Sequence, residues 1–451
     1  MISQTKTSSI NQEILKLAIP SILANITVPL VGMVDIAIVG HISDATSIGG
    51  IAIGTMLFDL LYWNFSFLRV GTGGLTAQAY GKGDTQAQIS HLIIGIRNAI
   101  VISLIIWLLQ WWFVDIVLYF VPCTKQVAEF ANRYFFIRIW AAPATLSLMV
   151  LKGWYIGMQN SIIPMICDIT VNVVNMLASF ILAIYTPLCI IGVAYGTVIA
   201  QYVGLIVALV PLKYVLRKSQ FAHTLTCHSI LTSIFALHHN ATKAEQKQST
   251  PLNLLLFIRS SCMLAIYVGF TSLTSLYGDE SLAIGTIMMK LFMLFSYLID
   301  GFAYAGEALT GRFIGAGNYQ KLVQSTKALI IWTLGISLLF TILFTFGGKW
   351  MFSLMTSSIE IIEHSQPYLP WLIAMPIFGC FAFMWDGIFE GATSGKYLML
   401  CMLYSLIGFF GCFYALKDSI GIQAIYVSYF AHLLIRALYL TFKYPTILHK
   451  V

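Results

Sequence analysis

The chain has 451 residues, of which 59% are hydrophobic and only 10% are charged, and its mean hydropathy is +0.84. This composition excludes an ordinary soluble domain, in which about a quarter of the residues are charged. The formal net charge of +7 does not indicate nucleic-acid binding, because the basic residues sort by loop and do not gather on one stripe.

Twelve segments of about 20 mainly apolar residues follow one another along the chain, and each can cross a hydrocarbon core of about 30 Å as a helix. The first, from about Ile14 to Val39, is too long for a signal peptide, so we expect it to stay in the mature protein. We therefore predict an all-α polytopic membrane protein. The segments are centred near Val28, Phe58, Val101, Ala142, Val174, Gln201, Ala265, Lys290, Gly335, Ile377, Tyr404 and His432.

Lys and Arg residues are distributed unequally between the two sides of the predicted membrane. One side, which includes both termini, carries fourteen of them, and the other side carries Lys125, Arg133, Lys349 and Lys417. Cytoplasmic loops carry the excess of positive charge in membrane proteins, so both termini are predicted to be cytoplasmic.

One long polar connection divides the predicted helices six and six. We predict an N-terminal six-helix lobe at residues 1–212, a cytoplasmic linker at 213–252 and a C-terminal six-helix lobe at 253–451. The division coincides with an internal repeat. "AIGTM" at 52–56 recurs as "AIGTIM" at 283–288, and "LTAQAYGKGD" from Leu75 recurs as "LTGRFIGAGN" from Leu309, an offset of 309 − 75 = 234.

The repeat carries a prediction about architecture. Gly157 in "WYIGMQNS" and Gly391 in "IFEGATSG" are also 234 residues apart. Because each half has an even number of helices, the two lobes are predicted to be related by a pseudo-two-fold axis along the membrane normal. This is the architecture of an alternating-access transporter; the alternative is a duplicated bundle that transports nothing.

A more specific signal comes from five stretches: "LAIPSILANITVPLVGMVDIAIVGHI", "FLRVGTGGLTAQAYGKGD", "GVAYGTVIAQY", "YLIDGFAYAGEALTGRFIGAGN" and "FMWDGIFEGATSG". With them the chain resembles the multidrug and toxic compound extrusion (MATE) family, in its DinF-like branch, over essentially its whole length. The resemblance implies twelve helices in two lobes and cation-coupled export of organic compounds across a bacterial cytoplasmic membrane.

Asp35 lies in the otherwise apolar stretch "VPLVGMVDIAIVGHIS" of the first predicted helix. A carboxylate near the bilayer centre costs about 2.5 to 3.5 kcal/mol on insertion scales, and such residues usually mark an ion or proton path. Pro29, six residues earlier, removes a backbone hydrogen bond and would bend or weaken the helix. We expect Asp35 to be the protonation and coupling site, as the resemblance also implies; the alternative is a permanently paired carboxylate that fastens helices together.

The resemblance extends the ion-coupling site to Asn175 and Thr197. Many relatives place an Asp four residues after that Asn, where this chain has Ser179. With one acid fewer, Na⁺ has a poorer cage, and H⁺ coupling through Asp35 is favoured. Asn172 either joins this network or bonds another helix. We expect no other cofactor and no metal, because the Cys and His residues lack ligand spacing.

Acidic residues of the second half occur in pairs at helical spacing. Asp300 and Glu307 are seven residues apart in "YLIDGFAYAGEAL", and Asp386 and Glu390 are four apart in "FMWDGIFEG". A cationic amphiphile needs such countercharge, so we predict that Glu307, Asp386 and Asp300 face the substrate or a second ion. The alternative is pairing inside the bundle with Lys290, Arg312 or Arg436.

Two more ionisable residues lie in apolar segments. Arg259 in "LFIRSS" is expected to extend to the lipid headgroups, which is the usual place for an arginine near a helix end. Asp59 has Met293 as its repeat partner at the offset of 234, so it is specific to the first lobe, and no role is indicated for it.

Two other functions compete with export. A lipid-linked oligosaccharide flippase would need clustered Arg and Lys for its pyrophosphate cargo, whereas these helices offer more acids than bases. A membrane-embedded enzyme would need a nucleophile with a base, or metal-ligand spacing, and neither pattern occurs. We therefore expect a monomeric, non-enzymatic exporter of lipophilic, cationic small molecules that is driven by H⁺ or Na⁺ and binds no nucleic acid.

Overall fold

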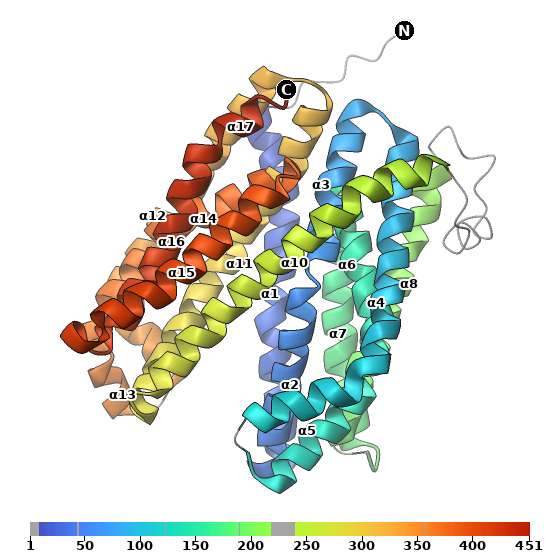
Figure 1. Ribbon diagram of the computed structural model, residues 1–451. Helices are drawn as coiled ribbons and strands as arrows, with labels where there is room; N and C mark the ends of the chain where they lie inside the picture. Colours follow the sequence, from blue (N-terminus) through green and yellow to red (C-terminus); the bar gives the residue numbers. More distant parts are fainter. Residues whose placement is uncertain (1–8, 43–44, 122, 189, 218–239, 357) are drawn as a thin grey trace. The chain divides into compact units, whose positions relative to one another are not determined.

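The computed structural model describes residues 9–42, 45–121, 123–188, 190–217, 240–356 and 358–451, which form helices and no strand (Figure 1). The chain divides into two compact units. We call residues 23–250 the N unit, and residues 1–22 together with 251–451 the C unit. Within the predicted linker, residues 218–239 lie outside the described ranges, and the residues on either side of them are helical.

The helices of the first half follow closely on one another. Helix α1 (Ile10–Ile42) runs as one helix through Pro29. It is followed by α2 (Ala45–Asn64), α3 (Phe67–Lys82), α4 (Thr85–Phe120), α5 (Lys125–Arg138), the short 3₁₀ helix η1 (Ile139–Ala141), α6 (Ala142–Gly157), α7 (Ile162–Ile184) and α8 (Ile190–Arg217).

The second half has the same succession of long and broken helices. It consists of α10 (Asn240–Ser275), α11 (Asp279–Gly315), α12 (Tyr319–Met355), α13 (Ile359–His364), the 3₁₀ helix η2 (Gln366–Tyr368), α14 (Leu369–Gly391), α15 (Gly395–Ile420), α16 (Gln423–Lys443) and α17 (Pro445–Leu448).

Eleven stretches among the described residues are long and apolar enough to cross a membrane. Some of them join two helices: α2 continues into α3 as one span, Gly49–Lys82, and α5 continues through η1 into α6 as Lys125–Gly157. Helix α1, with 33 residues, is the remaining long apolar helix. Together they agree with the twelve spans predicted from the hydropathy pattern.

The internal repeat is visible in how equivalent helices begin. Asp84 caps α4 by accepting a hydrogen bond from the Ala87 backbone N–H at 2.9 Å, and Asn318 caps α12 by accepting one from the Lys321 N–H at 3.0 Å. The two caps are 318 − 84 = 234 residues apart. Each follows a glycine in the left-handed region, with φ of +70° before the first cap and +63° before the second. The offset found in the sequence is therefore also an offset between equivalent turns.

The same offset relates two close helix contacts. On α6, a Cβ added at Gly153 would lie 2.1 Å from the carbonyl oxygen of Arg69 on α3. On α14, a Cβ added at Gly387 would lie 2.1 Å from the carbonyl oxygen of Ala303 on α11. Both members of the second pair are 234 residues beyond those of the first. In each unit, glycine thus lets the equivalent helix pair touch backbone to backbone, as small residues do in membrane bundles.

Alanine at Gly153 or at Gly387 is expected to destabilise the protein by about 1 to 3 kcal/mol or more, because the new methyl group would force these helices apart. The measurement is thermal unfolding of the detergent-solubilised chain. Gly335→Ala in α12 is the matched control, since nothing lies within 4 Å of a Cβ added there. Equal melting temperatures for the three variants would contradict the contact argument.

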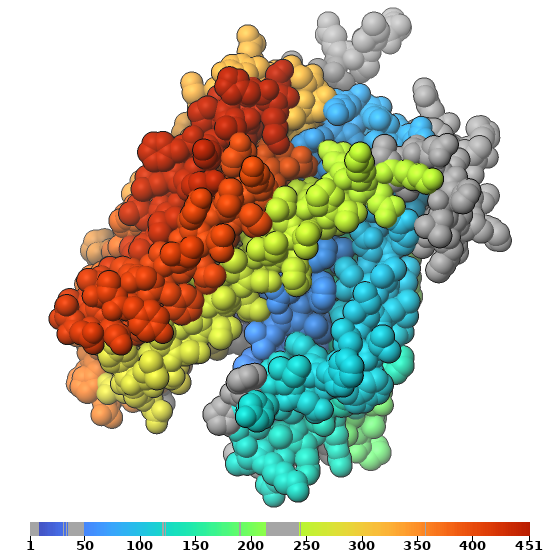
Figure 2. Space-filling view, in the orientation of Figure 1, coloured from blue at the N-terminus to red at the C-terminus, as the bar shows by residue number. Residues whose placement is uncertain are grey.

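Aromatic side chains fill the core of the C unit. The ring of Phe292 on α11 lies 5.7 Å from Phe295, and 5.9 Å from Tyr429 on α16 at an angle of 90°. On α10, Gly269 faces the rings of Phe409 and Phe410 on α15. Figure 2 shows α10 and α15 lying side by side on this face of the C unit. This packing joins α10, α11, α15 and α16 in one core.

Large apolar side chains also cover the outside of the long helices. On α12, Ile331 is 71% exposed and Phe346 is 87% exposed, and on α4, Trp112 is 70% exposed. A soluble helix would carry polar residues at such positions. Outward-facing apolar side chains are what a hydrocarbon environment requires, in agreement with a membrane-embedded bundle.

Candidate functional site

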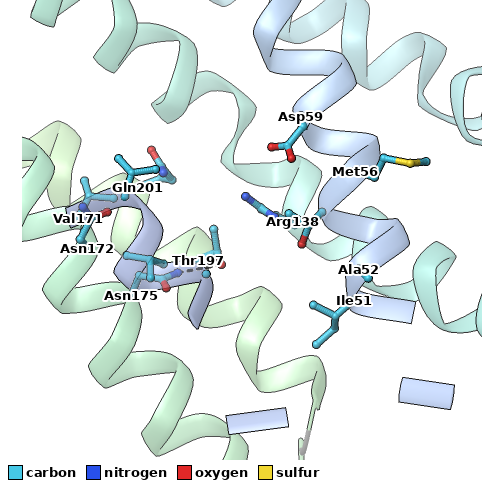
Figure 3. A pocket seen from close by; sticks show the side chains of 14 residues that line it. Ile51, Ala52, Met56, Asp59, Arg138, Val171, Asn172, Asn175, Thr197 and Gln201 are labelled. Atoms are coloured by element: carbon cyan, nitrogen blue, oxygen red, sulfur yellow. Dashed lines mark hydrogen bonds between the residues drawn. The ribbon is translucent and has the colours of Figure 1, made fainter. Parts of the chain in front are cut away.

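A pocket of about 460 Å³ lies within the N unit (Figure 3). Helices α1, α2, α5, α7 and α8 all contribute to its wall. The wall is formed by Val28, Val31, Gly32, Ile51, Ala52, Thr55, Met56, Asp59, Arg138, Val171, Asn172, Asn175, Thr197 and Gln201. In Figure 3, α2 and α5 present charged side chains on one side, and α7 and α8 present amides and a hydroxyl on the other.

The uncharged polar side brings Asn175 and Thr197 together, the two residues that the family resemblance assigns to ion coupling. The Asn175 Nδ2 donates to Thr197 Oγ1 at 2.9 Å, and Thr197 Oγ1 donates to the Val193 carbonyl at 3.1 Å. Asn175 is only 4% exposed, yet its Oδ1 has no hydrogen-bond partner among the described residues. Leaving such an oxygen without a partner costs about 1 to 3 kcal/mol. A buried acceptor beside a pocket is therefore suited to a cation or a donated proton.

A glycine on α8 explains how these two side chains come within bonding distance. A Cβ added at Gly196 would lie 2.6 Å from both the backbone nitrogen and Oγ of Ser179 on α7. The two helices therefore approach closely one turn away from Asn175. Ser179, at the position where the family resemblance implies an acid, is fully buried, and its Oγ likewise has no partner within the described part of the chain.

Asn172 bonds another helix, which is one of the two alternatives considered for it, and its part in ion coupling stays a prediction. It lines the pocket, and its Nδ2 donates to Thr27 Oγ1 of α1 at 2.5 Å. Thr27 in turn donates to the Ala24 carbonyl at 2.6 Å. A polar contact of this kind fixes α7 against the N-unit part of α1.

The charged side of the pocket consists of Asp59 on α2 and Arg138, the last residue of α5. The Arg138 guanidinium lies over the Phe58 ring, 4.6 Å from its centre, and donates to Tyr134 Oη at 3.2 Å. Neither Arg138 nor Gln201, which lies across the pocket, was predicted from the sequence. A usable signal was present in "YFFIRIWAAP", where one arginine stands alone in an apolar run.

Asp35 belongs to helix α1 by its backbone, and its side chain lies outside the described residues. Residues Val28, Val31 and Gly32 of the same helix line the pocket. The assignment of Asp35 to ion coupling therefore stays a prediction.

A buried charge cluster occupies the C unit. Asp386 on α14 accepts hydrogen bonds from Arg259 on α10 and Arg436 on α16, both at 2.6 Å. One turn further along α14, Glu390 accepts from Arg259 at 2.9 Å. All four residues are at most 8% exposed. The expectation that Arg259 extends to the headgroups is wrong, because two carboxylates at i and i+4 hold the two arms of its guanidinium fork.

His432 completes this cluster. Its Nε2 lies 3.4 Å from an Arg436 nitrogen, which can only donate, and its Nδ1 lies 2.9 Å from the Tyr429 carbonyl, which can only accept. These contacts assign the ring proton to Nδ1 of a neutral imidazole. The Arg436 guanidinium also lies 5.2 Å from the centre of the Phe383 ring. The charges of two guanidinium groups and two carboxylates thus cancel inside the bundle. For Asp386, this is the pairing with Arg436 that was given above as the alternative to substrate contact.

The other two predicted acids of this half lie on α11. Glu307 is fully buried, and Asp300, seven residues earlier, is partly buried. The Glu307 backbone carbonyl packs against Gly391, with 2.2 Å to a Cβ added there. A substrate or ion role for these two residues stays a prediction.

Comparison with known proteins decides the family. The MatE family model matches residues 20–181 and 256–413. The "DNA damage-inducible protein F" of Escherichia coli (strain K12) is 31% identical over 393 residues, covering 87% of this chain and 83% of that protein. The chain belongs to the MATE family. The resemblance expected from the five sequence stretches is confirmed.

Other relatives of this MATE protein carry the names of extrusion transporters. Human "Multidrug and toxin extrusion protein 1" is 24% identical over 398 residues, which cover 85% of this chain and 65% of that protein. A crystal structure of a MATE protein in the straight conformation matches with a TM-score of 0.86 at 17% identity, over 98% of each chain. The predicted fold class is confirmed, and the protein is a membrane transporter and not an enzyme.

One group of exposed residues in the C unit of this MATE protein has metal-ligand chemistry. Ligand atoms of Glu280, Glu360 and His364 lie within 4.8 Å of one another near the ends of α11 and α13. All three residues are exposed, and exposed carboxylates often come together without a metal. The group lies in a different unit from the pocket, and we assign it no role in transport.

Proposed function

We propose that the protein is a secondary-active exporter that exchanges organic compounds for H⁺, with Asp35 as the protonated residue. The observation that carries this proposal is the N-unit pocket, where a buried oxygen of Asn175 without a partner among the described residues stands beside the hydrogen-bonded Thr197. Val28, Val31 and Gly32 present one face of α1 to this pocket. By helical periodicity, position 35 is the next on that face, one turn beyond Val31.

The polar groups of the pocket support H⁺ over Na⁺ as the coupling ion. A hard cation is bound by several oxygen ligands, and carboxylates strengthen its binding. The family resemblance implies an acid one turn after Asn175, and this chain has Ser179 there. The acid that is present among the described wall residues, Asp59, shares its side of the pocket with Arg138. A proton needs only one carboxylate whose environment alternates between wet and closed states.

The C-unit cluster supports placing the coupling site in the N unit. Asp386 and Glu390 are already neutralised by Arg259 and Arg436. A coupling cation there would have to displace a guanidinium group that is held by charge-assisted hydrogen bonds. A carboxylate on the wall of a pocket can take up a proton without displacing a guanidinium group, so protonation costs less there.

The cargo is proposed to be lipophilic and organic, and to leave through a bacterial cytoplasmic membrane. The apolar part of the pocket wall suits such compounds, and relatives carry the names of multidrug and toxin extrusion proteins. The excess of Lys and Arg in one set of loops supports cytoplasmic termini. We further propose that one chain is sufficient for transport.

The test is efflux of a fluorescent lipophilic cation from proteoliposomes under an imposed proton or sodium gradient. We expect the proton gradient alone to drive transport, and an uncoupler to stop it. Empty liposomes provide the leak rate. Sodium-driven efflux would contradict the choice of ion, and efflux at the leak rate under both gradients would contradict the antiport mechanism.

A further inference from the structure

Asp59 and Arg138 give one wall of the pocket charges of both signs. We propose that these two residues bind the head group of a zwitterionic compound, with a carboxylate at Arg138 and a cationic group at Asp59. This inference rests on the proposed function only in taking the pocket to be a site that transported compounds enter.

Arg138 is held in a fixed orientation at the pocket wall. Its guanidinium lies against the Phe58 ring at 4.6 Å, and Tyr134 Oη accepts one of its hydrogen bonds at 3.2 Å. Phe58 is itself 1% exposed and stacks on Phe135, with the ring centres 4.9 Å apart. A guanidinium oriented by aromatic packing loses little freedom when it binds a carboxylate, which it can grip with two parallel hydrogen bonds.

Asp59 follows Phe58 directly on α2, so one helix turn carries both the support of Arg138 and the opposite charge. Asp59 is exposed although it lies within the membrane span Gly49–Lys82. Its carboxylate and the Arg138 guanidinium lie on the same side of the pocket in Figure 3. A charged side chain in a membrane span costs free energy, and one that faces a cavity usually binds a ligand or an ion.

The C unit shows what an ion pair closed inside the bundle looks like in this chain. There Asp386 is 7% exposed and is closed off by two guanidinium groups. By contrast, Asp59 and Arg138 open onto a cavity of about 460 Å³. The contrast favours a binding role for the N-unit pair over a fastening role.

The same pair determines which head groups bind most tightly. A compound with both charges replaces the attraction between Asp59 and Arg138 by two new ion pairs. A simple cation gains the attraction of Asp59 but meets the repulsion of Arg138, and a simple anion meets the reverse, so each is expected to bind more weakly than the zwitterion without being excluded. Apolar side chains of Val31, Ile51 and Met56 remain for the body of the molecule, with the Gln201 amide across the pocket.

The test is equilibrium binding to the purified full-length chain in detergent, without any gradient, followed by fluorescence anisotropy. The probes are tetramethylrhodamine, which has a free carboxylate beside its cationic ring system, its methyl ester, which is only a cation, and fluorescein, which is only an anion. Since one charge-assisted contact to Arg138 separates the first two, we expect the free acid to bind about tenfold more tightly than its ester. Fluorescein should bind more weakly than tetramethylrhodamine.

Three variants identify the residues responsible. Arg138→Gln should abolish the preference for the free acid, and Arg138→Lys should keep part of it. Asp59→Asn should weaken both rhodamines while the preference for the acid remains. Arg133→Gln, on the exposed part of the same helix, is the control and should change nothing. Size-exclusion profiles and melting temperatures show whether each variant is folded. If Arg138→Gln does not fold, the reduced preference of Arg138→Lys for the free acid still tests the role of Arg138.

Equal binding of acid and ester by the wild type, an unchanged preference in Arg138→Gln, or fluorescein binding as tight as that of tetramethylrhodamine would overturn the inference. These outcomes are distinct from failure of the proposed function. If the protein prefers the zwitterion but shows no gradient-driven efflux, the proposed binding site is supported and the antiport mechanism is contradicted. A proton-driven exporter without this preference would show the reverse.

Discussion

Asp35→Asn is expected to reduce proton-driven efflux to the leak rate of empty liposomes while the protein still folds and inserts. Asparagine has nearly the same size as aspartate but cannot take up and release a proton, so only the coupling step is removed. Removing a charge from an apolar helix also lowers the cost of inserting that helix, so the loss is expected without misfolding. The measurement is efflux from proteoliposomes under an imposed proton gradient, with wild type and variant reconstituted at equal amounts.

The matched control is Asp115→Asn on α4, an aspartate that is exposed and does not line the pocket. It undergoes the same chemical change in the same unit and should transport at the wild-type rate. Undiminished efflux in Asp35→Asn would move the coupling site elsewhere. Asp59 and the acids of α11 would then be the next residues to replace.

Asp386→Asn is expected to lower the free energy of unfolding by about 3 to 5 kcal/mol. We expect this loss to be larger than that caused by removing any other single charge. The wild-type carboxylate accepts hydrogen bonds from Arg259 and Arg436, both at 2.6 Å. Without it, Arg436 loses this carboxylate partner, and Arg259 keeps only Glu390 of the two acids that it contacts. The measurement is thermal unfolding of the solubilised protein, together with the monodisperse fraction in size exclusion.

Two comparisons make this second expectation specific. Asp418→Asn, at an exposed position of α15, should shift stability by no more than about 0.5 kcal/mol. The double variant Asp386→Asn with Arg436→Gln restores the charge balance and should regain part of the loss, which a double-mutant cycle measures as a coupling energy. A wild-type melting temperature in Asp386→Asn would show that the cluster does not stabilise the fold.

Sequence periodicity and repeats were sufficient to predict the helices and their duplication. The spans follow from hydropathy because every backbone group in lipid must be paired within its own helix. The offset of 234 was detectable because two of its matching residues, Gly157 and Gly391, occupy positions where helices touch through their backbones. At such positions close packing requires glycine, so the packing leaves a pattern that can be recognised in the sequence.

The partners of the charged residues could not be predicted in this way. Spacing placed Asp386 and Glu390 on one face of a helix, but it does not say which other helix that face meets. Their partner Arg259 is 127 residues from the first and 131 from the second along the chain. Arg138 was missed for a similar reason, because its meaning depends on Phe58 and Asp59 of a helix that is distant in sequence. Asn175 and Thr197 were predicted only through the family resemblance.

The charge cluster of the C unit also bears on the history of the chain. At the repeat offset, Asp386 corresponds to Lys152, since 386 − 152 = 234, and Lys152 pairs with Asp168 in the N unit. Equivalent sites in the two copies therefore carry opposite charges and different partners. Each half thus holds charged residues that fit the partners of its own unit. A tandem of two identical halves would no longer reproduce this molecule, because neither half retains both the pocket and the charge cluster.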